Sequence, residues 1–181
     1  CGFCSFARKP SEAGGYSMTI EDIAAKVRSS LAFGVIEYHI VGGHNPFLPF
    51  EFILDISRTI KQVNPKAHVK AWTMAEVEFF SQIYHLEVEE VLRSLKEAGV
   101  DSLPGGGAEI FAKRVRDLIC PNKVSGENWI RIAKTAHRLG LPSNATMLYG
   151  HLETIEERVE HLLWLREAQD ETHGFLSFIP L

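Results

Sequence analysis

The sequence predicts an α/β protein that forms part of a (β/α) barrel, and three observations support this. Five short apolar runs alternate with stretches of helical periodicity. These runs begin about 31 to 43 residues apart, close to the roughly 31 residues that each unit of a (β/α)8 barrel uses. Polar residues recur on one face of several runs. The predicted strands are residues 35–41, 68–72, 101–104, 144–149 and 175–179.

The strand faces favour a barrel over a doubly wound open sheet, which would show the same alternation of strands and helices. A parallel sheet covered by helices on both faces should be apolar on both. Here three of the predicted strands each carry one polar face, which indicates a wide interior that binds a polar ligand. These polar faces hold Glu37 with His39, His68 with Lys70 and Trp72, and Asn144 with Thr146.

Helix-boundary residues support the predicted helices. Thr154 and Glu157 match a capping box, and Thr19 with Asp22 gives a weaker version of it. Pro49 is placed to start a second helix. The longest interval between strands leaves room for an extra helix within residues 108–120. Behind Thr154, an amphipathic helix is predicted by the apolar stripe Ile155, Val159, Leu162 and Leu163.

Composition narrows the class of protein. With 181 residues, 45% hydrophobic and 23% charged, the chain is an ordinary globular protein of about one domain. The net charge of −4 and the absence of a basic cluster argue against nucleic-acid binding. No apolar run reaches the roughly 18 residues that a membrane-spanning helix needs. Three cysteines are too few for a disulfide scaffold and favour a reducing compartment, the cytoplasm.

The two ends of the sequence predict an incomplete domain. The chain opens on a cysteine without a signal peptide, and residues 175–181 resemble a buried strand with nothing after it. A lipid-bearing N-terminal cysteine is the alternative, but such proteins normally begin with a flexible polar tether. We therefore expect residues 1–181 to be a single incomplete barrel domain that lacks N- and C-terminal parts.

Glycine-containing segments follow three of the predicted strands, where barrels carry their active sites. They are residues 42–46, 105–109 and 149–154. Each run is consistent with a plain turn or with a ligand cradle, and phosphate binding is a competing interpretation. His151 and Glu153 alone are weak evidence for zinc, because no third ligand with suitable spacing is evident.

Cys1 and Cys4 form a C-x-x-C pair that is compatible with a redox dithiol, half of a zinc site or part of an iron–sulfur site. Cys120 has no neighbouring cysteine and is expected to be an inert residue at a helix end. The pair is therefore best explained by an iron–sulfur cluster whose remaining ligand precedes Cys1.

The N-terminal segment resembles the second half of the C-x3-C-x2-C motif of radical S-adenosylmethionine (SAM) enzymes, including Phe3 before the last cysteine. Residues 146–153 resemble the family's strand motif near the adenine, with Thr146 in place of the usual glycine. The resemblance implies a radical SAM barrel, with Cys1 and Cys4 as ligands of a [4Fe–4S] cluster. It implies that SAM is bound by Phe3, Gly42, Gly43, Glu109, Met147, Tyr149, Gly150, His151 and Glu153.

Longer segments are similar to aminofutalosine synthases of the menaquinone futalosine pathway, namely LPGGGAEIF, ICPNK, NATMLYGHLET and REAQDET. The sister cyclic dehypoxanthinyl futalosine synthases and the deazaflavin (FO) synthases share fewer of these segments. The resemblance implies addition of the 5′-deoxyadenosyl radical of SAM to 3-[(1-carboxyvinyl)oxy]benzoate, with flavodoxin or ferredoxin as electron donor and without nucleic-acid or membrane partners. Lys70, His39 and His68 are the expected partners of the two substrate carboxylates.

Overall fold

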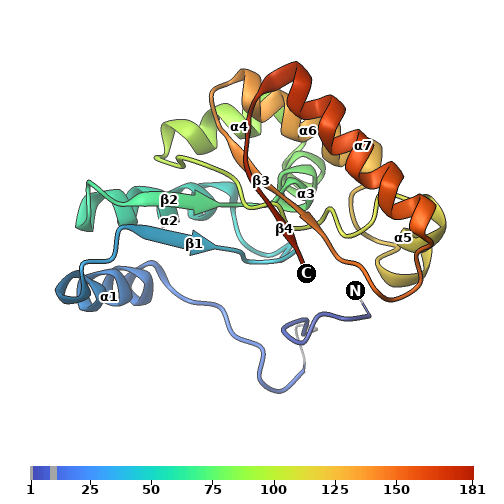
Figure 1. Cartoon of the computed structure of the whole chain (residues 1–181). Helices are drawn as coiled ribbons and strands as arrows, with labels where there is room; N and C mark the ends of the chain where they lie inside the picture. Colours follow the sequence, from blue (N-terminus) through green and yellow to red (C-terminus); the bar gives the residue numbers. More distant parts are fainter. Residues whose placement is uncertain (1, 9–11) are drawn as a thin grey trace.

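The structure is a computed structural model that describes residues 2–8 and 12–181 (Figure 1). Helices and strands alternate along most of the chain, as the sequence predicts. In chain order they are α1 (Ile20–Ser30), the 3-10 turn η1 (Leu31–Phe33), β1 (Glu37–Ile40), α2 (Phe50–Val63), β2 (His68–Ala71), α3 (Met74–Tyr84), α4 (Val88–Glu97), α5 (Lys113–Ile119), α6 (Gly126–Arg138), β3 (Ser143–Met147), α7 (Ile155–Thr172) and β4 (Phe175–Pro180).

The strands run parallel in two pairs, β1 with β2 and β3 with β4. The segment predicted as the third strand joins the pairs through two single parallel bridges, Lys70 to Ser102 and Leu103 to Ser143. Backbone hydrogen bonds follow the same order, with Ala71 N–H donating to Ser102 C=O at 3.0 Å. The carboxyl ends of all these segments therefore meet at one edge of the sheet.

Helix caps confirm the predicted boundaries. The side chains of Thr19 and Thr154 cap α1 and α7, each in a complete capping box, and Pro49 is the N-cap of α2. The extra helix of the long interval is α5. A further capping box, formed by Thr73 and Glu76, begins α3.

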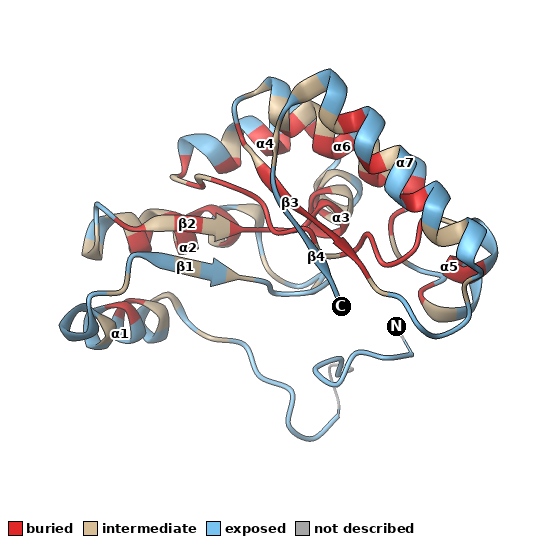
Figure 2. Cartoon of the chain, viewed as in Figure 1, coloured by how far each residue is buried: buried red, intermediate tan, exposed pale blue. Residues whose placement is uncertain are grey.

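The hydrophobic core lies between the strands and helices α2, α3, α4 and α6. Its large, fully buried side chains include Phe80, Leu92 and Trp129. Every residue of β3 is buried, whereas β1 and β4 contain no buried residue, and most of β4 is exposed. Figure 2 shows this contrast, with red along β3 and pale blue along β4. The centre of the sheet is thus closed on both faces, while its two outer strands are open.

The apolar stripe on α7 lies away from the core. Ile155, Val159, Leu162 and Leu163 are between 42% and 72% exposed. The buried residues of α7 are instead His161, Leu165 and Ala168. The helix predicted from this stripe is thus present, but the stripe is not its buried face in the described chain, because α7 carries apolar side chains on two faces and packs only one of them.

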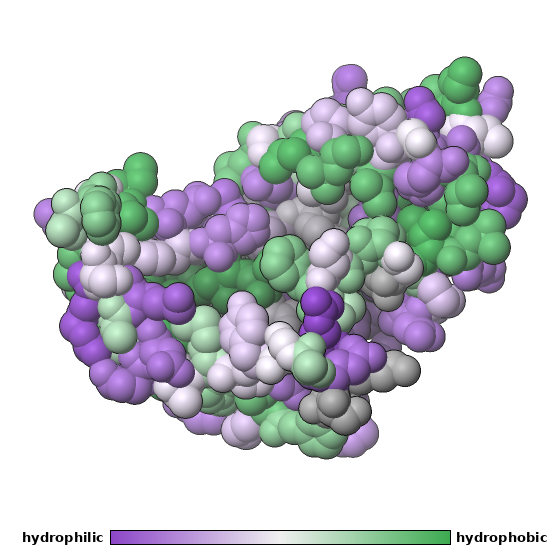
Figure 3. Space-filling view, turned by 90° about the horizontal axis from the view of Figure 1, so that it is seen from below, coloured by the Kyte–Doolittle hydropathy of each residue, from purple (hydrophilic) through white to green (hydrophobic). Residues whose placement is uncertain are grey.

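The N-terminal segment crosses below the sheet toward α5 (Figure 1). Gly2 N–H donates to Ile119 C=O at 3.1 Å, which fixes this segment to the end of α5. Figure 3 views this side from below and shows apolar residues interspersed with hydrophilic ones. Within the described ranges, no helix has the length and hydropathy needed to cross a bilayer.

Candidate functional site

The loops at the carboxyl ends of the strands contact one another and form a continuous rim. Leu148, just after β3, donates its N–H to Glu109 C=O at 2.9 Å. A Cβ atom on Gly106 would lie 2.9 Å from the Thr73 methyl group, so the loop that begins at residue 104 also lies against the start of α3. The parallel topology thus brings together segments that are far apart in the sequence.

The predicted cluster segment lies against this rim. Cys4 is an exposed free cysteine, and Cys1 lies outside the described residues. The Lys123 ammonium sits 5.4 Å from the centre of the Phe3 ring and 2.6 Å from Glu109 Oε1. Lys123 therefore links the N-terminal segment to the loop that follows the third predicted strand.

The Gly42–Gly43 turn after β1 is held from one side by Glu76. Glu76 Oε1 accepts from Gly42 N–H at 2.7 Å and from Gly43 N–H at 2.9 Å. Glu76 Oε2 accepts from the Thr73 N–H and hydroxyl, both at 2.8 Å. Gly43 has φ +73°, and a Cβ there would meet nothing within 4 Å. This turn is thus fixed on its Glu76 side and open around Gly43.

The Gly105–Gly107 run is closed, in contrast. A Cβ on Gly105 would come within 2.8 Å of Asn144 C=O, and one on Gly107 within 2.8 Å of the Ala75 methyl. Both distances are shorter than real Cβ contacts. Packing against β3 and α3 therefore explains these glycines without a ligand, which favours the plain-turn interpretation for this segment.

Glu109 sits at the end of this closed turn in a left-handed conformation, with φ +47°. It is buried, and its carboxylate pairs with Lys123. Arg116 fixes the same turn from behind by donating to the carbonyls of Gly107, Ala108 and Ile110. Burial lowers the pKa of Arg116, although nearby Cys120 and Glu109 oppose that shift.

The turn after β3 is organised by Glu153. Its carboxylate accepts from Gly150 N–H at 2.5 Å, from His151 N–H at 3.0 Å and from Arg158 Nε at 2.6 Å. Burial alone would raise the pKa of Glu153, but these backbone and guanidinium donors lower it to about 2. The Glu153 side chain is fully covered, so it can shape the predicted SAM site but presents no free carboxylate to it.

The neighbours of Glu153 are more accessible. Tyr149 is 45% exposed, and the Arg158 guanidinium lies 5.3 Å from its ring centre. His151 is exposed, with Nε2 3.0 Å from Leu148 C=O. Of the residues predicted after β3, Tyr149 and His151 are therefore the side chains available to a ligand.

Met147, the last residue of β3, is turned away from solvent. Its side chain packs with Ile110 and Val115 in a small buried apolar cluster. His161 closes the space behind, accepting from Phe111 N–H at 3.3 Å through Nδ1 and bonding Thr146 C=O at 3.0 Å through Nε2. Burial lowers the pKa of His161 to about 4, so this imidazole is neutral. The Met147 side chain is thus occupied by packing, and its C=O accepts from Leu181 N–H at 2.8 Å.

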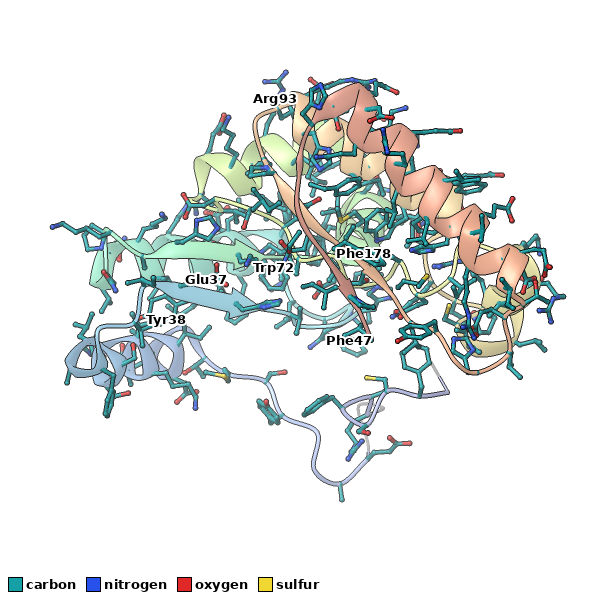
Figure 4. The ribbon with its side chains drawn as sticks, in the orientation of Figure 1. Glu37, Tyr38, Phe47, Trp72, Arg93 and Phe178 are labelled. Atoms are coloured by element: carbon teal, nitrogen blue, oxygen red, sulfur yellow. The ribbon has the colours of Figure 1, made fainter. Side chains whose placement is uncertain are left out.

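The polar strand face holds the three predicted substrate-binding residues. Lys70 pairs with Glu37 at 2.9 Å and its side chain is 13% exposed. His68 Nε2 lies 2.6 Å from Ser102 Oγ. His39 is exposed and sits beside Lys70 in the strand register. Figure 4 labels Glu37 on β1, on the side facing β2.

Sequence reasoning missed the roles of two residues of this region, Glu76 and Lys123, and the pairing of a third, Glu37. Glu76 is signalled by the Thr73-x-x-Glu76 capping pattern, but its contact with the glycines depends on tertiary structure. Lys123 belongs to the ICPNK segment, and nothing in that segment predicts its partner Glu109. Glu37 was identified on the polar face, whereas its pairing with Lys70 depends on strand register.

The residues present fit a SAM-bound cluster. Cys4 offers an exposed thiol beside the rim. The open Gly43 leaves room for a ligand to approach the backbone. Within residues 2–8 and 12–181, no three potential metal-ligating side chains lie together. Such a cluster would therefore need ligands beyond the described residues, as the resemblance implies for Cys1.

A profile of the radical SAM superfamily matches residues 1–165. The chain therefore belongs to the radical SAM superfamily, which confirms the predicted family and its cofactors, a [4Fe–4S] cluster and SAM. Among solved structures, HydG, a maturase of the [FeFe]-hydrogenase, matches 96% of this chain and 38% of its own with a TM-score of 0.68 at 17% identity. That likeness confirms the radical SAM fold.

Curated relatives indicate which radical SAM enzymes this chain resembles. The aminodeoxyfutalosine synthase of Thermus thermophilus is 52% identical over 181 residues, which are all of this chain and 49% of that protein. A 5-amino-6-(D-ribitylamino)uracil–L-tyrosine 4-hydroxyphenyl transferase of Methanosarcina barkeri is 42% identical and matched over 47% of its length. The chain thus spans about half the length of these relatives.

Proposed function

We propose that this chain provides the cluster- and SAM-binding part of an aminodeoxyfutalosine synthase of menaquinone biosynthesis. The reaction would add the 5′-deoxyadenosyl group of SAM to 3-[(1-carboxyvinyl)oxy]benzoate, release methionine, and release one carboxylate of the benzoate substrate as bicarbonate or CO2, giving 6-amino-6-deoxyfutalosine. The observation that carries this proposal is the 52% identity to the Thermus thermophilus enzyme across the whole chain.

The cluster, when loaded and reduced, supplies the electron that cleaves SAM to a carbon radical. Cys1 and Cys4 would be two of its ligands. The Gly42–Gly43 turn would bind the SAM amino group, and Tyr149 and His151 are placed to contact the adenosyl part. Glu109, paired with Lys123 at the rim, is a further candidate for SAM.

The polar strand face would bind the substrate. The enolpyruvyl benzoate carries two carboxylates, and Lys70, His39 and His68 supply a cation and two imidazoles along β1 and β2. Because Glu37 already pairs with Lys70 at 2.9 Å, a substrate carboxylate would have to share or displace that partner. Charge-assisted hydrogen bonds are stronger than those between neutral groups.

Product analysis tests the proposal. The complete gene product, reconstituted anaerobically with iron and sulfide, is incubated with SAM, dithionite and the enolpyruvyl benzoate. A product that contains the deoxyadenosyl group supports the proposal, and the Cys4→Ala variant should form none. Free 5′-deoxyadenosine as the sole SAM-derived nucleoside would contradict it and would fit a hydrogen-abstracting relative instead.

A second candidate is the hydroxyphenyl transferase reaction of the deazaflavin (FO) synthase group. It is favoured by the 42% identity to the Methanosarcina barkeri transferase over the whole chain. Supplying L-tyrosine and 5-amino-6-(D-ribitylamino)uracil in place of the benzoate discriminates the two. Coupling of these substrates, with no adduct from the benzoate, would establish the second candidate.

The electron donor and the location remain predictions. A small iron–sulfur protein or flavoprotein, such as ferredoxin or flavodoxin, would deliver the electron to the cluster. We expect this to occur in the cytoplasm, because the low cysteine count suits a reducing compartment.

A further inference from the structure

Glu76 is a buried carboxylate that joins two loops of the rim. It is 3% exposed, and both of its oxygens accept hydrogen bonds from donors of the chain. One oxygen binds the amides of Gly42 and Gly43, and the other binds the amide and hydroxyl of Thr73. A charge buried this deeply is costly unless it is fully hydrogen-bonded, and four donors meet that requirement.

Capping of α3 explains only half of these contacts. Asp22 occupies the matching position in α1 and accepts from the Thr19 amide at 2.9 Å and hydroxyl at 2.7 Å. Asp22 is exposed, and these contacts with Thr19 cap its helix. Glu76 performs the same capping and additionally reaches back to the turn after β1. That additional contact points to a role in the turn.

The contact determines where the carbonyls of the turn point. In a trans peptide the N–H and C=O groups point in opposite directions, and cis peptides are absent from the described chain. Because the Gly42 and Gly43 amides point at Glu76, the carbonyls of Val41 and Gly42 point away from it. These two oxygens are acceptors suited to an ammonium group.

Trp72 fills the space beneath this turn. It follows β2 in Figure 4 and is 2% exposed, with a left-handed backbone of φ +67°. A Cβ on Gly42 would come within 3.1 Å of its indole ring. A bulky residue held in this conformation is strained, and such strain concentrates at functional sites. Glu76 and Trp72 thus restrict the Gly42 backbone from two sides.

We propose that Glu76 is a positioning residue for SAM: its carboxylate holds the Gly42 and Gly43 amides so that the turn presents its carbonyls to the SAM ammonium group. The inference rests on the proposed assignment of this turn to SAM. Removing Glu76 would free the turn to rotate its peptides. The chemistry of the cluster ligands themselves would be unaffected.

The test compares two capping carboxylates in the complete, cluster-loaded gene product. The SAM dissociation constant is measured from the SAM-induced change in the electron paramagnetic resonance (EPR) spectrum of the reduced cluster. Glu76→Ala should raise it about tenfold, because a lost charge-assisted contact of this kind weakens binding by that order. Asp22→Ala loses the same helix cap and should leave the dissociation constant unchanged. Iron content should be equal in both.

Glu76→Gln provides a milder second variant in case Glu76→Ala folds poorly. A glutamine amide has one acceptor oxygen, and its NH2 group would face amide donors at one end or the other. If the glutamine oxygen turns toward the glycines, that contact is kept and the helix cap is weakened, because the NH2 group then faces Thr73. The Thr73 hydroxyl can rotate to accept from this NH2 group. We therefore expect a smaller rise in the dissociation constant than for Glu76→Ala.

Gly43→Val separates this inference from the assignment of the turn to SAM. If Gly43→Val weakens SAM binding and both Glu76 variants bind SAM within twofold of the wild type, Glu76 does not position the turn and the inference is wrong. If none of the three variants changes the dissociation constant, the turn does not bind SAM, and the proposed site is wrong as well.

Discussion

Two glycine-rich turns lie at the same edge of the sheet and differ in why they contain glycine. Around Gly105 and Gly107, backbone and side-chain atoms approach so closely that a Cβ would clash at 2.8 Å. Around Gly43, nothing lies within 4 Å of a Cβ, and the neighbouring amides bind Glu76. The first turn is thus a packing element and the second is available to a ligand, although both read as glycine-rich loops in the sequence.

The largest expected effect is on the closed turn. Gly105→Ala would place a methyl group 2.8 Å from the carbonyl oxygen of Asn144 and 2.9 Å from the backbone of Ala145. Backbone atoms of a fully buried strand cannot move aside, so we expect the free energy of unfolding to fall by about 3 kcal/mol. Urea denaturation measures it. A loss below ~1 kcal/mol would show that the turn is not packed as described.

Acid should destabilise the folded chain through two histidines. Burial lowers the pKa of His161, which bonds the Phe111 amide, and that of His137, from 6.5 to about 4. Between pH 6.5 and about 4, both imidazoles are protonated in the unfolded chain and largely neutral in the folded chain. Stability is therefore full above that window and falls as the pH drops through it.

The size of this pH effect can be checked directly. Each histidine should cost about 2 kcal/mol of unfolding free energy at pH 5 relative to pH 7. In His161→Gln the difference between the two pH values should shrink by about half, whatever the stability of the variant at pH 7. An unchanged pH dependence would mean that His161 is protonated as readily in the folded chain as in the unfolded one.

Lys70 tests the ligand side of the comparison, because it lies on β2 opposite His39 of β1, the strand that leads into the open turn. Replacing it with alanine removes the cation proposed for a substrate carboxylate. We expect KM for the substrate to rise about tenfold, or turnover to fall by that factor, with the cluster content unchanged. His85→Ala, at an exposed helix end, is the control. Unchanged kinetics in cluster-loaded Lys70→Ala would remove this residue from the site.

The smallest structural effect is expected at the open turn itself. Gly43→Ala meets no neighbouring atom, so only the left-handed backbone opposes it, at about 1 kcal/mol. Thermal denaturation of Gly43→Ala and Gly105→Ala, measured side by side, compares the loss of stability at the two turns. A loss at Gly43 equal to that at Gly105 would contradict the description of one open and one closed turn.

Much of the fold follows from local sequence, because each of its signals acts within a few residues. The Thr154–Glu157 box and Pro49 mark helix starts correctly, and the alternation of apolar runs gives the parallel order. The inward face of α7 was not predictable from its stripe alone. Its helix is apolar on two faces, and tertiary packing selects His161, Leu165 and Ala168.

The site is less predictable, because its contacts join distant segments. The resemblance indicates which loops line the rim, but the partners of Gly42 and Lys70 lie on other elements. Glu153 is an example. Its sequence position suggests that it contacts a ligand, whereas its carboxylate accepts hydrogen bonds from the Gly150 and His151 amides of its own turn. Whether a glycine is needed for close packing or for ligand access depends on residues that are distant in the sequence, so a local sequence pattern does not reveal it.

The most direct test of the account is the EPR spectrum of the complete gene product, reduced anaerobically, before and after SAM is added. The account predicts a [4Fe–4S] signal that changes on adding SAM and is lost in Cys4→Ala. Purified, reconstituted protein without iron, or a cluster signal that SAM leaves unchanged at saturating concentration, would contradict it.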